Sequence, residues 1–307
     1  MERGASRTAA FVALWRAIES SRSPATRLFE DPLAQTFLGW RFQWALRVSR
    51  LPGVGAVWPW SLVDGHWPGP RGTVSVRTRY IDDLVREALR RGVNQIAILG
   101  AGFDSRAYRI QGITQARVFE VDHPATQAEK RKRITGQLGT IPRHVRFVPA
   151  DFSTEALDTV LSRSGYQTEA STFFICEGVT HYLSAEAVDA VVRSVARSAA
   201  PGSRMVFTYI HRGILDGSVR FAGANQTLAT VRRAGEPYTF GFDPAELPQY
   251  LVARGLRLIE DVGASTYRDR YLTPLGRGQE PLVEFQRAAL VEIRKAVSRS
   301  ERTGPLD

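Results

Sequence analysis

The chain has 307 residues, of which 43% are hydrophobic and 23% are charged, and its formal net charge is +10. This composition is typical of a folded globular protein and argues against extensive disorder. The basic surplus favours a solvated basic surface, or attraction to acidic small molecules. We expect no nucleic-acid partner, because the densest basic run, Lys130 to Arg133, is short and falls in a predicted helix.

Cysteine usage and hydropathy predict a cytoplasmic protein. The single cysteine, Cys176, cannot form an intrachain disulfide, which fits a reducing compartment, and we expect it to be buried in a strand. No apolar run reaches the ~18 residues of a transmembrane helix, and no signal-peptide pattern is present, so we expect no membrane association. The five histidines are too scattered for a metal motif, so we expect no metal.

The N-terminal part carries helix signals without strong strand signals. The segment from Thr8 to Ser20 spaces its apolar residues as an amphipathic helix does. We predict a helical cap over residues 1–72, packed on a main domain of residues 73–307. A tryptophan-rich segment within this cap could act as a lid over a flat substrate, as packing material, or as both. Its tryptophans are Trp40, Trp44, Trp58, Trp60 and Trp67.

Short apolar runs then alternate with helix-like segments. The predicted helices span residues 74–91, 185–198 and 243–253, the last one capped by Asp243. The alternation predicts an α/β fold with a mostly parallel sheet covered on both faces. The predicted strands are Gln95–Leu99, Arg117–Asp122, Val145–Pro149, Thr172–Cys176, Arg204–Ile210, Leu256–Val262 and Ala288–Ile293.

A glycine or polar residue follows or ends each of the first five runs. These residues are Gly100, Asp122, Asp151, Glu177 and His211. Parallel sheets of this kind bind ligands outside the carboxyl ends of their strands. We therefore expect these side chains to line one edge of the sheet.

The turn after the first predicted strand has the form of a ligand-binding loop. Gly100 and Gly102 allow the backbone to pass close to a ligand, while Ser105 replaces the third glycine of a dinucleotide-binding loop. Asp122, 20 residues beyond Gly102, can accept hydrogen bonds from a ribose, and Asp151 from an adenine amino group. Either carboxylate could instead cap the segment that follows it. In this order, the residues describe an adenosine site without a phosphate cradle, which suits S-adenosylmethionine.

Five strings are specific in combination: RTRYID at 77–82, LGAGFDSRAYR at 99–109, FEVD at 119–122, ADF at 150–152 and EGVTHYL at 177–183. On these strings, the chain resembles the leucine carboxyl methyltransferase family, specifically its bacterial branch with polyketide-pathway O-methyltransferases. The likeness covers residues 70–260, and Gly235 to Tyr238 fits a looser family pattern. His181 stands where that pattern calls for a hydrophobic residue.

The resemblance implies a Rossmann-like class I methyltransferase fold with a seven-stranded sheet and S-adenosylmethionine as cofactor. Family enzymes most often methylate a carboxylate. The implied cofactor-binding residues are Arg77 at the methionine carboxylate, Gly100, Ala101 and Gly102 along the methionine part, Asp122 at the ribose, Asp151 and Phe152 at the adenine, and Glu177 at the amino group.

Methyl transfer to a carboxylate needs no general base, whereas transfer to a hydroxyl needs one or a strongly acidic hydroxyl. His211 is the predicted base candidate, with a solvent-facing loop histidine as the alternative. Tyr209 could point into the site or belong to the core. Arg106 and Arg109 could attract an acidic substrate or face solvent.

The first functional hypothesis is an O-methyltransferase of a small acidic metabolite, such as a polyketide or an aromatic acid. A protein C-terminal carboxylate is an alternative acceptor. A nicotinamide-dependent oxidoreductase on a similar sheet is a further alternative, which Ser105 in place of the third glycine disfavours.

Overall fold

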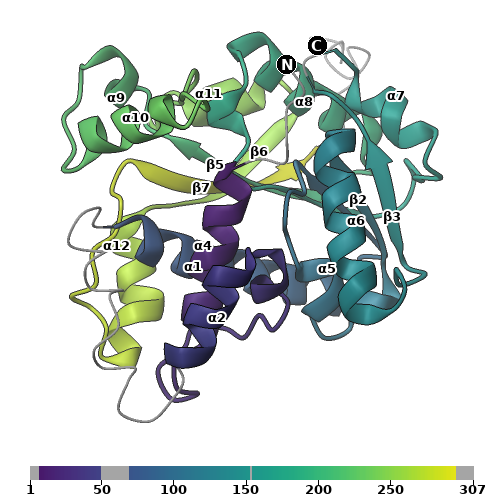
Figure 1. Ribbon diagram of the computed structural model, residues 1–307. Helices are drawn as coiled ribbons and strands as arrows, with labels where there is room; N and C mark the ends of the chain where they lie inside the picture. The colour runs from purple at the N-terminus through teal and green to yellow at the C-terminus, as the bar shows by residue number, and fades with distance from the viewer. Residues whose placement is uncertain (1–6, 50–68, 153, 295–307) are drawn as a thin grey trace, which may run out of the picture.

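The computed structural model describes residues 7–49, 69–152 and 154–294 (Figure 1). At its centre lies a seven-stranded sheet of order β3-β2-β1-β4-β5-β7-β6. The predicted strands are confirmed, except that the last one begins two residues earlier. Their bounds are β1 (Gln95–Leu99), β2 (Arg117–Asp122), β3 (Val145–Pro149), β4 (Thr172–Cys176), β5 (Arg204–Ile210), β6 (Leu256–Val262) and β7 (Gln286–Ile293).

The sheet is mostly parallel, as predicted. Strands β3, β2, β1, β4 and β5 are parallel neighbours, while β7 is antiparallel to both β5 and β6. Within β1, Ala97 and Leu99 belong to one hydrophobic core, and Ile96 and Ile98 belong to another. Because successive strand residues point to opposite faces, an unbroken apolar strand requires helices on both faces.

Helices cover both faces of the sheet (Figure 1). The helices α4 and α12 lie on one face with α1 and α2 outside them, whereas α7, α8 and α11 cover the other. The described helices are α1 (Arg7–Ser20), α2 (Trp40–Ser49), α4 (Pro70–Arg90), α5 (Arg106–Arg109), α6 (Pro124–Leu138), α7 (Leu157–Ser162), α8 (Ala185–Ser198), α9 (Gly213–Asp216), α10 (Ala224–Arg233), α11 (Leu247–Val252) and α12 (Ala264–Tyr267).

The predicted helices of the main domain differ from the structure mainly at their starts. Helix α4 begins four residues early, at Pro70, a residue whose fixed φ suits a first helical position. Helix α11 begins four residues late, because Asp243 starts a separate turn and its Oδ1 accepts a hydrogen bond from the Ala245 N–H at 2.9 Å. No helix within the described ranges is long and apolar enough to cross a bilayer.

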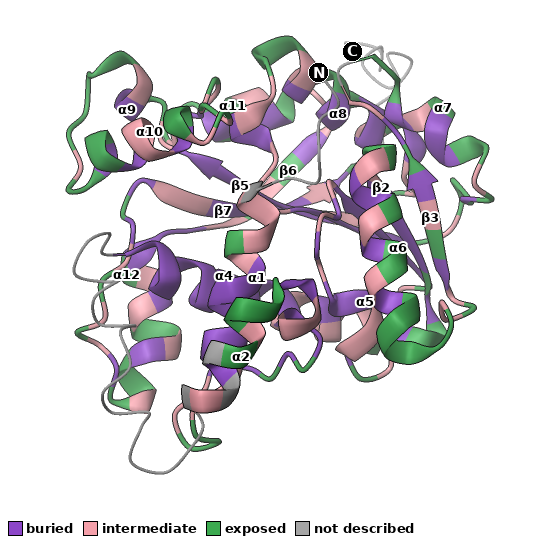
Figure 2. Cartoon of the chain, viewed as in Figure 1, coloured by how far each residue is buried: buried purple, intermediate pink, exposed green. Residues whose placement is uncertain are grey.

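The N-terminal segment packs on the main domain through a hydrophobic cluster of its own. Phe37 of η1 (Ala34–Phe37) stacks on Phe103 of the glycine loop, with ring centroids 4.9 Å apart. Helix α1 lies against α4, which is buried along most of its length (Figure 2). The predicted division at residues 72 and 73 falls in the first turn of α4 and stays a prediction.

The tryptophan-rich segment is described only in part. Trp40 and Trp44 of α2 are 75% and 59% exposed, respectively. Trp58, Trp60 and Trp67 lie outside the described residues. The choice between a lid and packing material therefore stays open.

A buried ion pair anchors α1 to the glycine loop, which leads to a prediction about stability. Arg16 Nη1 lies 2.9 Å from both Asp31 Oδ2 and Ser105 Oγ, and the Asp31 side chain is fully buried. Asp31→Asn leaves the Arg16 charge buried without a counter-charge, so we expect a loss of about 3–5 kcal/mol in the free energy of unfolding. Urea denaturation and limited proteolysis within residues 7–49 measure this loss.

The control is Glu30→Gln, which breaks the more exposed pair between Arg27 and Glu30. Exposed pairs contribute about 0–1 kcal/mol, so this variant should unfold like the wild type. Equal stability of the two variants would refute the anchoring role of Asp31.

Candidate functional site

The carboxyl ends of five neighbouring parallel strands form one edge of the sheet. The order β3-β2-β1-β4-β5 places their terminal or following residues side by side along that edge. These are the residues that the sequence assigned to one edge, and the structure brings them together in the order Asp151, Asp122, Gly100, Glu177 and His211.

The glycine loop at the centre of this edge needs both of its glycines. Gly100 has φ +69°, and a Cβ there would lie 2.3 Å from Val179 Cγ2. Gly102 has φ +41°, and its N–H donates to Asp122 Oδ2. The N–H groups of Gly100 and Ala101 both donate to the Val121 carbonyl, at 2.8 and 3.0 Å. The loop is thus bent back onto the end of β2.

Asp122 is held in place by backbone donors. Its Oδ2 accepts from the Gly102 N–H, and its Oδ1 accepts from the His123 N–H at 2.6 Å. Burial raises the pKa of Asp122, while the two backbone hydrogen bonds act in the opposite direction. Each carboxylate oxygen has a further lone pair, so the pair of oxygens can still accept from two vicinal hydroxyls.

Asp151 and Phe152 follow β3 at the outer end of the edge. The Asp151 N–H donates to Glu155 Oε2 at 3.1 Å, and the Asp151 carbonyl accepts from the Thr154 and Glu155 N–H groups. Phe152 packs against the core below α7 and α8. Asp151 therefore starts a turn but does not cap the next helix, because α7 begins at Leu157 with Ala156 at its N-cap position. Its role at an adenine stays a prediction.

On the other side of the glycine loop, two arginines bind one carboxylate. Glu177 Oε1 lies 2.7 Å from Arg77 Nε of α4, and Glu177 Oε2 lies 2.6 Å from Arg106 Nη1. Burial disfavours the charged carboxylate, but the Arg106 and Arg77 charges outweigh it and hold the pKa of Glu177 below its ordinary value. Glu177 is therefore an anion at neutral pH.

Arg77 keeps part of its guanidinium available for another partner. Its Nη1 lies 3.5 Å from Gln286 Oε1, at the limit of a hydrogen bond, whereas its Nε is engaged at 2.7 Å. A guanidinium can bind a carboxylate through two parallel N–H groups. Arg77 and Glu177 together thus offer a positive and a negative group to a zwitterion.

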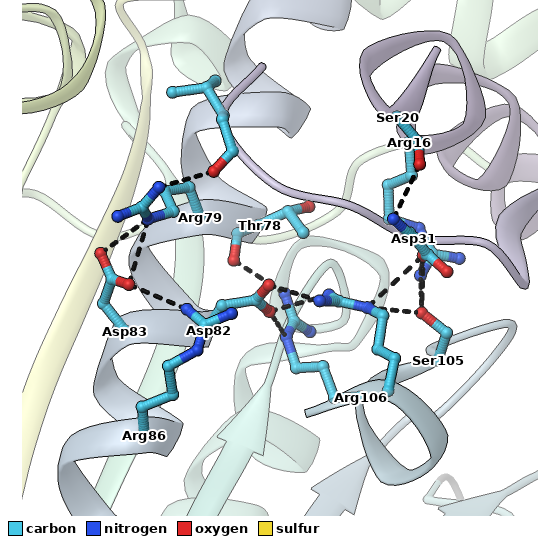
Figure 3. Close-up of polar contacts among 12 residues, drawn as sticks. Arg16, Ser20, Asp31, Thr78, Arg79, Asp82, Asp83, Arg86, Ser105 and Arg106 are labelled. Atoms are coloured by element: carbon cyan, nitrogen blue, oxygen red, sulfur yellow. Dashed lines mark hydrogen bonds and ion pairs between the residues drawn. The ribbon is translucent and has the colours of Figure 1, made fainter. Parts of the chain in front are cut away.

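The solvent-facing alternative for Arg106 and Arg109 is wrong, because both side chains are buried in ion pairs. Their side chains are only 3% and 4% exposed, and both bind Asp82 of α4. Arg106 Nε lies 2.8 Å from Asp82 Oδ1 (Figure 3). Arg109 Nη1 lies 2.6 Å from Asp82 Oδ2. Arg106 also binds Asp104 at 2.6 Å. Two arginines that the sequence suggested for substrate attraction therefore hold the site together.

A second carboxylate extends this network to the N-terminal helix. Ser105 Oγ donates to Asp31 Oδ2 at 2.6 Å (Figure 3). It also accepts from Arg109 Nε at 2.9 Å. The serine in place of a third glycine thus has a structural function. Sequence reasoning missed Asp82, Asp31 and Arg16. For Asp82, its place at the end of the RTRYID string was the available signal.

The two predicted catalytic residues have hydrogen bonds that weigh against proton acceptance. The Tyr209 hydroxyl donates to Asp261 Oδ2 at 2.8 Å, and burial followed by the Asp261 charge raises the pKa of Tyr209. His211 Nδ1 accepts from the Gly213 N–H at 3.0 Å, which places the proton of the neutral ring on Nε2. A proton-accepting role for either residue stays a prediction without support from this geometry.

Another buried charge pair lies beneath the glycine loop. Lys130 of α6 has its Nζ 2.9 Å from Glu120 Oε2 and 3.4 Å from the Ala101 carbonyl. Cys176 is buried at the end of β4, as predicted, and burial raises the pKa of its thiol to about 12. Within the described ranges, no group of three or more His, Cys, Asp or Glu side chains is arranged to hold a metal ion.

Comparisons with known proteins agree on one family. The model of the family described as leucine carboxyl methyltransferase matches residues 9–196. A protein of Streptomyces coelicolor is 35% identical over 222 residues, which cover 70% of this chain and 71% of that relative. A protein of Bacillus subtilis is 30% identical over 203 residues, 66% of each chain. Both names assign these relatives to the S-adenosyl-L-methionine-dependent methyltransferases and give no acceptor.

Solved structures share the fold over nearly the whole chain. A DUF574 family protein from Streptomyces avermitilis superposes with a TM-score of 0.59 at 13% identity, covering 94% of this chain and 98% of that one. A protein from Thermobifida fusca, described as a methyltransferase, gives a TM-score of 0.56 at 16% identity, with 95% and 96% covered. At this identity the likeness concerns the fold alone.

The close approach at Gly100 leads to a prediction about ligand binding. Gly100→Ala brings a Cβ against Val179, so we expect the loop to shift and the affinity for S-adenosylhomocysteine to fall at least about tenfold. The control is Gly92→Ala, whose φ of +80° is similar but whose Cβ would meet nothing within 4 Å. Both variants carry the ~1–2 kcal/mol strain of a left-handed alanine. Isothermal titration should therefore separate them, and equal affinities would contradict the prediction.

Asp122 provides an independent test of the same edge. A hydrogen bond to a charged group contributes about 1.5–3 kcal/mol, so Asp122→Ala should weaken S-adenosylhomocysteine binding by an order of magnitude or more. Asp158→Ala is the control, because it removes a carboxylate that pairs with Arg197 away from this edge. Unchanged affinity in the Asp122 variant would refute its ribose role.

Proposed function

Because the chain belongs to the leucine carboxyl methyltransferase family, and is thus an S-adenosylmethionine-dependent methyltransferase, we propose that it methylates a carboxylate of a small organic acid. The acceptor is a secondary metabolite of the polyketide or aromatic-acid type, and the product is a methyl ester. An acidic hydroxyl is the second acceptor that this site could serve.

The proposed cofactor residues are those that the family resemblance implies, and the charges at the sheet edge support them. Arg77 binds the methionine carboxylate, and Glu177 binds the methionine ammonium. The loop of Gly100, Ala101 and Gly102 passes beneath the methionine part, and Asp122 accepts from the ribose hydroxyls. Asp151 and Phe152 bind the adenine. The ion pair between Arg77 and Glu177, at 2.7 Å, supports this assignment, because it presents opposite charges to a zwitterion.

The observation that favours a carboxylate acceptor is the lack of a suitable general base among the described residues of the sheet edge. Among the described residues of the edge, Glu177 is a stable anion between two arginines, Tyr209 donates to Asp261, and His211 Nδ1 is occupied. None of the three is arranged as a general base. A carboxylate nucleophile needs none, because its oxygen bonds to the methyl carbon while the carbon–sulfur electron pair moves to sulfur and no proton is released.

Helix α1 lies over the glycine loop, which favours a small acceptor over the C-terminal tail of a protein. A Cβ at Gly102 would lie 3.5 Å from the Ala9 Cβ of α1. Thr8 donates from its N–H and its hydroxyl to Glu236 Oε2, which joins α1 to the loop before Tyr238. We propose that α1 helps to enclose the reacting groups and to exclude water, which strengthens the electrostatic interactions inside.

The alkali lability of the methylated product tells a carboxylate acceptor, which gives an ester, from a hydroxyl acceptor, which gives an ether. We expect radiolabelled methyl to be transferred to members of a panel of aromatic and polyketide-like acids, giving esters that mild alkali hydrolyses. Matched phenols without a carboxyl group should give no product. His211→Ala should retain the wild-type kcat within about threefold, because loss of a real general base costs about 100-fold or more.

An alkali-stable ether, together with a large loss of activity in His211→Ala, would contradict the proposal.

The dependence of kcat/KM on pH offers a second measurement. The pKa of Glu177 lies below its ordinary value, so its anion is present at neutral pH and is lost only as the pH falls through that lowered pKa. With an ionised carboxylate acceptor, kcat/KM should be level from about pH 7 to about pH 9.

A further inference from the structure

A buried histidine next to the proposed site has a ring nitrogen without a partner. His181 lies on η3 (Thr180–Tyr182), just after Glu177, and is 5% exposed. Its Nδ1 is buried and has no hydrogen-bond partner. An unsatisfied buried polar atom costs about 1–3 kcal/mol, and such atoms in folded proteins require a reason. A ligand that hydrogen-bonds Nδ1 would provide one.

Aromatic rings hold the imidazole in place. The His181 ring centroid lies 4.3 Å from that of Tyr182 and 4.5 Å from that of Tyr238, and the two tyrosine rings are 5.5 Å apart. The His181 carbonyl accepts from the Thr239 N–H at 2.8 Å, which fixes the backbone. The two tyrosine rings therefore restrict the imidazole, the hydrogen bond fixes its backbone, and Nδ1 keeps no partner.

The electric field at His181 favours an anion next to it. Burial, and then the charge of Arg77, lowers the pKa of His181 to about 3, so the imidazole is neutral at physiological pH. Arg77 is the charged side chain that acts on His181, and Tyr182 and Tyr238 are the titratable groups that face it, within the part of the chain that the structure describes. Burial opposes any charge here, but the Arg77 charge, which disfavours a proton on the ring, stabilises a carboxylate beside it by the same Coulomb interaction.

We propose that His181 binds the acceptor carboxylate through an Nδ1–H hydrogen bond, an inference that rests on the proposed function. The neutral donor orients one carboxylate oxygen, while the other oxygen stays free to attack. A cationic donor would withdraw more charge from the nucleophile than a neutral one does. His181 keeps its proton throughout, because the oxygen that attacks the methyl carbon releases none. His181 is thus an acceptor-binding residue that selects for carboxylic acids.

The test compares two substitutions at this position. His181→Leu removes the donor and leaves an apolar side chain between the tyrosines, so we expect the acceptor KM to rise about tenfold, the equivalent of one hydrogen bond of ~1.4 kcal/mol. His181→Asn places an amide N–H near the position of Nδ1 and should keep KM within about threefold of wild type. Both should bind S-adenosylhomocysteine like the wild type. The acceptors are those acids of the panel that give alkali-labile esters.

A matched control separates this role from a general loss of stability. His144→Leu is the same replacement at a histidine whose Nε2 contacts the Ala107 carbonyl at 2.8 Å, away from the acceptor side. It should lower the thermal unfolding temperature without changing the acceptor KM. A purely structural His181 would behave in the same way, with a lowered unfolding temperature and an unchanged acceptor KM in His181→Leu.

Two kinds of failure can be told apart. An unchanged acceptor KM in His181→Leu, or a tenfold loss of S-adenosylhomocysteine affinity, would overturn the role of His181 and leave carboxyl methylation intact. A wild-type protein that binds S-adenosylhomocysteine but esterifies no acid of the panel would overturn the proposed function, and the inference with it.

Discussion

The structure depends on one buried interaction, the contact of Arg106 with Asp82, Asp104 and Glu177. Arg106 comes from the segment after the glycine loop, Asp82 from α4 and Glu177 from the end of β4. Its contacts therefore fix a loop, a helix and a strand end relative to one another. Burial opposes the charge of Arg106, but the three carboxylates outweigh it and raise its pKa. The guanidinium is a permanent part of the core.

The wider network contains four arginines and four carboxylates whose side chains are at most 13% exposed: Arg16, Arg77, Arg106, Arg109, Asp31, Asp82, Asp104 and Glu177. Equal numbers of opposite charges make this burial tolerable, whereas removal of one partner would leave a charge unpaired. An apolar core of the same volume could be equally stable. The charges instead hold Glu177 as an anion in a set orientation, which an apolar core could not do.

Most of the fold could be predicted from the sequence, and the polar network could not. The strands are short apolar runs that alternate with helical segments, so local patterns were sufficient to find them. The sheet edge followed from the rule that parallel sheets bind ligands outside the carboxyl ends of their strands. The partners of Arg106 and Arg109 were missed because Asp82 lies more than twenty residues away, on a helix whose rotation no local pattern sets. Tyr209 was ambiguous for a similar reason, since its partner, Asp261, lies on β6 and reaches it across β7.

The position of Arg77 connects the network to the chemistry. On one side it binds Glu177, which offers a negative charge, and on the other it acts on His181, which stays neutral. A sulfonium cofactor carries a positive centre that must meet an anionic nucleophile, and both charges vanish as the methyl group moves. A site with a second buried cation at the nucleophile would stabilise the reactants over that charge-poor transition state. The proposed neutral donor at His181 avoids a second cation at the nucleophile and so avoids this penalty. The arrangement around Arg77 therefore supports the proposed carboxylate acceptor over a neutral hydroxyl.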